Sequence, residues 1–176
     1  MRPLTRTRRA GFTLIELLIV VAIIGMIAAI LIPNMIEAMQ KGRQKRTLAD
    51  LRHIGLGLTQ YWTDRGGAAA AGQQTVDISE WEGDVTPEDL GDALVPDYMP
   101  HLPLEDGWGF EIEYRIRLAD PPATRYALIR AQGSDGEFSG DSYESGQFAA
   151  TDYGADIVWA DGAFLRAPAI TMDSGS

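Results

Sequence analysis

The sequence of 176 residues contains no cysteine, which excludes a disulfide framework, a thiolate metal site and a cysteine nucleophile. It has only two histidines, His53 and His101, and it lacks the metalloprotease, nucleophile-elbow, P-loop and Rossmann motifs. No set of residues therefore meets the requirements of a catalytic site, and we do not expect an enzyme. Basic residues are also few, 15 against 25 acids, and the net charge of -10 argues against a nucleic-acid partner.

This charge is unevenly distributed along the chain. Residues 1–11 carry four arginines and no acid, and residues 12–33 carry one charge, that of Glu16. As a helix, the second stretch is roughly 33 Å long, enough to cross a hydrocarbon core of about 30 Å. The basic start places the N-terminus in the cytoplasm and the remainder outside. The length of the chain allows one domain with such an appendage.

Three interpretations of the apolar segment compete: a cleaved secretory signal, a plain membrane anchor, and a segment in which Glu16 has a function. A cleaved secretory signal has an apolar core of about 7–15 residues, and this run is longer. A plain membrane anchor fits the length but does not explain Glu16, because a carboxylate in an apolar helix is costly and suggests a function. The alternative is that Glu16 lies near enough to the segment's end to reach the membrane surface.

The string RRAGFTLIELLIVVAIIGMIAAILIPN, residues 8–34, resembles the prepilin-type signal of type IV pilins and type II secretion pseudopilins. The resemblance implies that a prepilin peptidase cuts between Gly11 and Phe12 and that Phe12 is then N-methylated. Glu16 becomes the fifth residue of the mature chain and is expected to pair with the N-terminal amine of a neighbouring subunit. The chain then divides into a leader (1–11), a transmembrane and assembly helix (12–33) and a periplasmic domain (34–176).

The same resemblance implies a structural subunit that polymerises into the pseudopilus of a type II secretion system. The implied partners are further copies of the chain, other pseudopilins, the prepilin peptidase, and an inner-membrane assembly platform with its ATPase. A type IV pilin, major or minor, is the first alternative, although many pilins close a disulfide loop that this chain cannot form. A membrane-anchored module that carries the signal but does not polymerise is the second.

Apolar residues between positions 48 and 62 recur at three- and four-residue spacing, which is typical of an amphipathic helix. We therefore predict one long helix from about residue 12 to 64, interrupted or softened at Pro33 and Gly42. In the resembled family this part of the helix unravels on assembly, which makes Pro33 a candidate assembly residue. A loop is predicted over 66–83, and Thr86 followed by Pro87 predicts a short helix over about 87–95.

Alternating apolar and polar residues predict strands over 110–118 and 124–131, with a turn at 120–123. Asp161-Gly162 is a hairpin signal between two further strands, 156–160 and 163–167. The predicted fold class is α+β, with the long helix packed on a small antiparallel sheet, as in type IV pilins.

Residues 133–157 carry six acids and no base, and their carboxylates suit a hard cation such as Ca²⁺. GSDG (133–136) and ADIVW (155–159) resemble the calcium loop of major type II pseudopilins, with Asp135 and Asp156 at matching positions. The sequence departs from that family at Gly154, where an acid is common, and at Gly107, where the family has proline. Asp152 is predicted to replace the missing acid, so Ca²⁺ would be bound through Asp135, Asp152 and Asp156. The alternative is an acidic loop without metal.

Overall fold

The computed structural model describes residues 11–64, 75–77, 85–117 and 126–169. It divides into two compact units, Met1–Ala38 and Met39–Ser176, which are described separately. The turn predicted at 120–123 lies outside the described residues. Most of the loop predicted over 66–83 lies outside them too, but Thr75–Asp77 within it form strand β1, so the prediction of a loop was wrong there.

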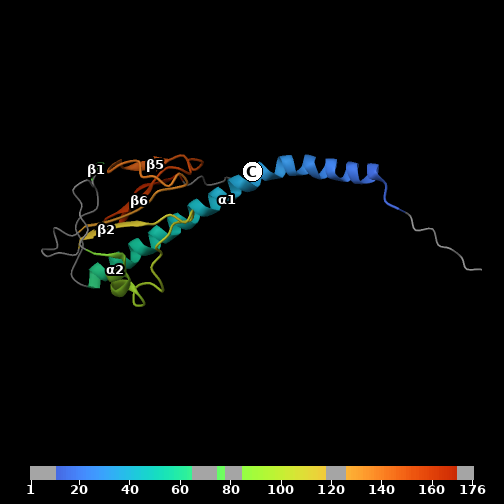
Figure 1. Ribbon diagram of the computed structural model, residues 1–176. Helices are drawn as coiled ribbons and strands as arrows, with labels where there is room; N and C mark the ends of the chain where they lie inside the picture. Colours follow the sequence, from blue (N-terminus) through green and yellow to red (C-terminus); the bar gives the residue numbers. More distant parts are fainter. Residues whose placement is uncertain (1–10, 65–74, 78–84, 118–125, 170–176) are drawn as a thin grey trace, which may run out of the picture. The chain divides into compact units, whose positions relative to one another are not determined.

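Helix α1 begins at Leu14 and ends at Asp64 (Figure 1). It continues without a break through Pro33 and Gly42, so the predicted interruption is wrong, while the softening stays a prediction. One proline removes one backbone hydrogen bond from a helix of 51 residues, and good helix formers continue on both sides of it.

The first unit contains the apolar part of α1. This part is long and apolar enough to cross a membrane, judged by length and composition. Its large apolar side chains, from Leu14 to Ile36, are exposed. A helix that is apolar on all sides needs a partner outside itself, either lipid or other helices.

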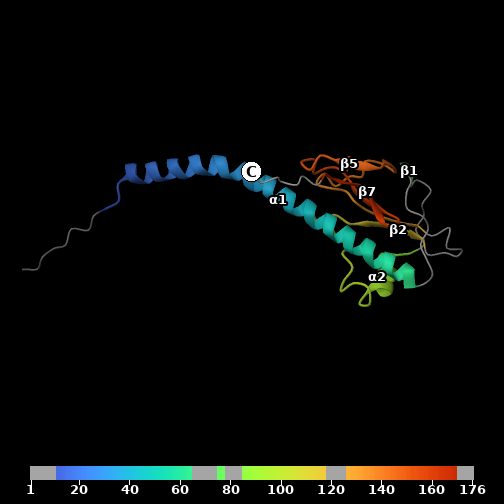
Figure 2. The same cartoon turned by 180° about the vertical axis from the view of Figure 1, so that it is seen from behind.

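The second unit is a five-stranded sheet against the C-terminal part of α1, in the order β2-β3-β6-β7-β5 (Figure 2). The strands are β2 (Glu113–Arg117), β3 (Tyr126–Ala131), β6 (Ile157–Ala160), β7 (Ala163–Pro168) and β5 (Gly146–Phe148). Strand β4 (Ser142–Glu144) pairs separately with β1. All pairs are antiparallel except β5 with β7, which are parallel, so the sheet is mostly antiparallel rather than wholly so.

The predicted apolar stripe of α1 forms the core of this second unit. Ile54 and Leu58 are fully buried, and Trp62 is nearly so, against the sheet residues Ile129 and Trp159. Helix and sheet approach closely because residue 55 is glycine: a Cβ there would lie 2.3 Å from the Trp159 indole. The long helix packed on a sheet, the core of the predicted α+β fold, is confirmed.

Short elements complete this unit. Helix α2 spans Pro87–Leu94, and Thr86 caps it as predicted, in a reciprocal capping box with Asp89. Asp161 and Gly162 both have positive φ, as expected for the two-residue hairpin turn between β6 and β7. Strand β2 begins at Glu113 rather than at residue 110, because residues 104–112 form a separate narrow hairpin.

Candidate assembly segment and acidic loop

The N-terminus of α1 is closed by Thr13 and Glu16. The Thr13 backbone N–H and hydroxyl donate to Glu16 Oε2 at 2.8 and 2.7 Å, and the Glu16 N–H donates to Thr13 Oγ1 at 3.3 Å. This arrangement is a capping box, which satisfies donors that a helix start otherwise leaves free. The sequence reasoning missed it, although the Thr-x-x-Glu spacing is its usual signature.

Gly11 and Phe12 precede α1 in non-helical, exposed backbone, and the Phe12 side chain is 75% exposed. An extended, accessible peptide is what a peptidase needs at a cleavage site. Pro33, the other candidate assembly residue, lies inside α1. The processing and assembly roles of these residues stay predictions.

A hairpin over residues 104–112 holds α1 where the second unit begins. Trp108 Nε1 donates to Gln40 Oε1 at 2.6 Å, and the Gly107 N–H donates to Thr47 Oγ1 at 2.9 Å. A Cβ on Gly107 would lie 2.2 Å from the Arg43 carbonyl oxygen. Glycine at 107, a departure from the resembled family, is therefore required here both for space and for its N–H, which proline lacks.

Asp106 shapes the tip of this hairpin. Its Oδ1 accepts hydrogen bonds from the Trp108 and Phe110 backbone N–H groups at 2.8 and 2.9 Å. Its Oδ2 is buried without a hydrogen-bond partner. Burial raises the pKa of the Asp106 carboxyl above its usual value, although the hydrogen bonds from Phe110 and Trp108 oppose the rise.

The acidic loop is organised around a buried arginine that sequence reasoning did not single out. The Arg130 guanidinium is 4% exposed and lies 2.7 Å from a Glu113 carboxylate oxygen and 3.1 Å from one of Asp141. It also donates to the Gly140 carbonyl and to the Tyr143 hydroxyl, and it stacks 3.9 Å over the Phe138 ring. Part of the loop's negative charge is thus compensated inside the chain.

Arg130 is connected through Tyr143 to one of the candidate metal ligands. Asp156 Oδ2 accepts from the Tyr143 hydroxyl at 2.7 Å and from the Ser139 N–H at 2.9 Å. Asp156 is fully buried, and its Oδ1 has no hydrogen-bond partner. Burial raises the pKa of the Asp156 carboxyl, because the charged form is poorly solvated there.

Asp135 and Asp156 come from two segments that the fold brings together. The Ser134 N–H donates to the Tyr153 carbonyl at 2.7 Å, which joins the 133–136 turn to the residues just before Asp156. A Cβ on Gly154 would lie 3.2 Å from Asp135 Oδ2, so glycine at 154 leaves room for that carboxylate. The side chain of Asp135 is exposed.

Asp152 differs from the other two candidate ligands. Its carbonyl accepts from Gln44 Nε2 on α1 at 3.2 Å, and its side chain is exposed. Within the described ranges, no group of three or more acidic or histidine side chains is placed to hold a metal by itself. An ion in this loop would therefore need backbone oxygens as well as carboxylates.

The chain matches the model of the prokaryotic N-terminal methylation motif over residues 6–32. It is 28% identical to the type II secretion system core protein G of Pseudomonas aeruginosa over 137 residues, 77% of this chain and 90% of that protein. Against the core protein G of Vibrio cholerae the identity is 24%, covering 73% of this chain and 85% of that protein. Comparison with solved structures found no significant match.

The type IV major pilin protein PilA of Myxococcus xanthus is 51% identical over 47 residues, 27% of this chain, which spans only 21% of that pilin's length. The methylation motif, the apolar N-terminal part of α1 and the small sheet packed on its C-terminal part make the chain similar to type IV pilins and pseudopilins. Over most of its length it is like the type II secretion system core protein G.

Proposed function

We propose that this chain is a structural subunit of a pseudopilus, the filament of a type II secretion system. The observation that carries the proposal is similarity over 90% of the length of a core protein G, joined to a methylation motif on an exposed apolar helix. In this role a prepilin peptidase cuts between Gly11 and Phe12 and Phe12 is methylated. The apolar helix then anchors the subunit in the inner membrane, with the globular unit in the periplasm.

Assembly follows from the chemistry of Glu16. Before assembly, the Thr13 N–H and hydroxyl are the hydrogen-bond donors to its carboxylate. Cleavage creates an ammonium at Phe12 and methylation converts it to a methylammonium; this cation on a neighbouring subunit is a stronger partner than a hydroxyl. Pairing favours the one stagger of subunits that leaves neither charge alone in an apolar filament core. The motor for this step would be an assembly platform and its ATPase, with other pseudopilins in the same filament.

The proposal is tested on material sheared from cells that express the full-length chain together with a type II secretion system. Electron microscopy is expected to find filaments, and mass spectrometry is expected to find a first residue of methylated Phe12. Deleting the gene for this chain is expected to stop secretion of the system's substrates and to leave surface pili intact. Loss of pili with normal secretion would overturn the assignment.

A type IV pilus subunit is the second candidate. It is favoured by a short match of 31 residues, 18% of this chain, that is 64% identical to the type IV wide pilus major component PilA4 of Thermus thermophilus. The deletion experiment separates the two filament types. A third candidate, a membrane-anchored module that does not polymerise, predicts cleavage at Gly11 without filaments.

We also propose that the acidic loop binds Ca²⁺. Two observations support it: Asp156 Oδ1 is buried without a partner, and the fold brings the Asp135 turn against residues 153–154. Asp135 and Asp156 would supply carboxylate oxygens, Asp152 a third, and the neighbouring turns would supply carbonyls. The ion would neutralise a carboxylate that burial otherwise destabilises.

Thermal unfolding of the full-length chain in detergent tests this site. Ca²⁺ at 100 times its dissociation constant is expected to add about 2.7 kcal/mol of stability, and a chelator is expected to remove it. Mg²⁺ should be less effective, since it requires a more regular octahedral shell. Asp135→Asn should abolish the calcium response, whereas Asp92→Asn, an exposed substitution on α2, should preserve it. Identical transitions with calcium and with chelator would refute the site.

A further inference from the structure

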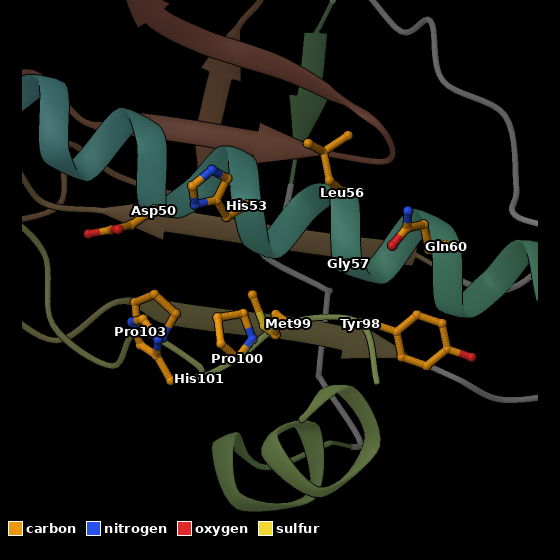
Figure 3. A pocket seen from close by; sticks show the side chains of 10 residues that line it. All are labelled: Asp50, His53, Leu56, Gly57, Gln60, Tyr98, Met99, Pro100, His101 and Pro103. Carbon is orange, nitrogen blue, oxygen red and sulfur yellow. The ribbon is translucent and has the colours of Figure 1, made fainter. Parts of the chain in front are cut away.

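One side of α1 in the globular unit carries an exposed leucine beside a groove. Leu56 is 57% exposed. Next to it lies a groove of about 360 Å³ between α1 and the segment 98–103, lined in part by Tyr98, Met99 and Pro100 (Figure 3). Gly57 lines the groove from α1, and a Cβ there would lie 3.8 Å from Tyr98, in ordinary van der Waals contact. The surface formed by Leu56, Gly57, Tyr98, Met99 and Pro100 is called the Leu56 groove below.

Polar groups border the Leu56 groove. His53 on α1 and His101 on the opposite wall both line it (Figure 3). Arg52 lines a second hollow that also borders Leu56, on the side of β6 and β7. Asp50 also lines the groove, and one of its carboxylate oxygens lies 3.5 Å from Arg46 Nε. Asp64 and Asp97 line a further hollow beyond Leu56, toward the C-terminal end of α1. N–H donors and a cation for an acidic partner are therefore found on one side of Leu56, at Arg52, His53 and His101.

The hairpin over residues 104–112 exposes apolar side chains together with acidic ones. Leu104 and Phe110 are 54% and 36% exposed, and with Leu56 they are the exposed large apolar residues after Met39 in the described ranges. Glu105 and Glu111 face each other across this hairpin, and both are exposed. Like charges directly opposite each other destabilise a strand pair unless a cation or donor lies between them.

We propose that the hairpin over residues 104–112 of one copy docks onto the Leu56 groove of the next copy in the filament. Exposed apolar side chains of one patch would fill the apolar groove of the other, and the two glutamates would meet the Arg52 and histidine border. Because the two patches differ and lie on one chain, the contact can be heterologous and repeat without closing, as a filament requires. This inference rests on the proposed polymerisation.

Engineered cysteines test the contact cleanly because the chain has none of its own. The variant Leu56→Cys/Leu104→Cys, oxidised in assembled filaments by copper phenanthroline, should form a ladder of dimers, trimers and longer species. A disulfide needs Cβ atoms about 3.5–4.5 Å apart, so a ladder reports close apposition. Either cysteine alone should give less than a tenth of that product. The matched control is Asp92→Cys/Leu104→Cys, with its second thiol on exposed α2, which should give no ladder.

Two outcomes separate this inference from the proposed function. Filaments of the double-cysteine variant that form normally but give no ladder would overturn the contact and leave polymerisation standing. A chain that is processed and folded yet never forms filaments would overturn the proposed function itself. Dimers from Leu56→Cys alone would also overturn the contact, because they would mean a self-complementary interface.

Charge exchange gives a second readout that does not depend on cysteine. Glu111→Lys should lower filament yield at least threefold at low salt, and Arg52→Glu in the same chain should restore most of it. The two single variants should each be defective and should each keep the wild-type unfolding transition, since both side chains are exposed. Additive defects in the double variant would contradict the pairing.

Discussion

The two parts of α1 differ in where their partners come from. After Met39 the helix buries Leu51, Ile54 and Leu58 completely against its own sheet. Before Met39 large apolar side chains, such as Ile27 at 53%, remain exposed. The chain thus supplies the partners of one part, while lipid or other subunits have to supply those of the other. One helix therefore has its first part in a lipid or subunit environment and its second part in a protein core. Between Leu14 and Ile36 the only charged residue is Glu16.

The largest expected effect compares two isoleucines of α1. Ile54→Ala removes a fully buried side chain and should lower the free energy of unfolding of the globular unit by about 2–5 kcal/mol. Ile27→Ala, in the exposed part, should change it by less than about 0.5 kcal/mol. Urea unfolding followed by tryptophan fluorescence, on full-length protein in detergent, measures both. Equal losses in the two variants would remove the distinction between the two parts.

A smaller effect is expected where the hairpin holds the start of the second part. Gly107→Ala places a Cβ 2.2 Å from the Arg43 carbonyl oxygen and should cost about 1–3 kcal/mol as the hairpin shifts. Amide exchange should then increase from about Gln40 to Thr47 while the N–H groups near Ile54 stay protected. Gly91→Ala inside α2, where a Cβ meets nothing within 4 Å, is the control and should raise stability by about 0.5–1 kcal/mol instead of lowering it.

The smallest effect is a pH dependence from Asp106. Burial raises the pKa of this carboxyl in the folded chain, so the folded state binds a proton more readily than the unfolded state. Its contribution to stability therefore decreases as pH rises from the unfolded pKa of 3.8 through the raised folded value. Asp106→Asn keeps the oxygen that accepts from Trp108 and should flatten this decline. Unfolding midpoints measured between pH 4 and 7 that decline equally in both chains would contradict the assignment.

The features predicted correctly from sequence were those with a local signature. The spacing of Leu51, Ile54 and Leu58 predicted the buried face of α1, Thr86-Pro87 the start of α2, and Asp161-Gly162 the hairpin turn. Each depends on residues within a few positions of one another, which local propensity and periodicity describe well.

The features that were missed depend on contacts between distant segments. Strand β5, Gly146–Phe148, has no alternation of its own and exists because it pairs with β7 twenty residues later. Nothing in the local sequence indicates that Arg130 is buried. Its burial is tolerable because the fold brings Glu113, Gly140 and Tyr143 against its guanidinium.

The measurement that most directly tests the central claim is filament formation by the variant Glu16→Ala. The account predicts that this chain is inserted, cleaved after Gly11 and folded as the wild type is, but that sheared fractions examined by electron microscopy contain no filaments. Glu16→Gln, which keeps the size and loses the charge, should fail in the same way. Filaments of normal number and length from Glu16→Ala would contradict the account, because assembly would then proceed without the charge pair on which it depends.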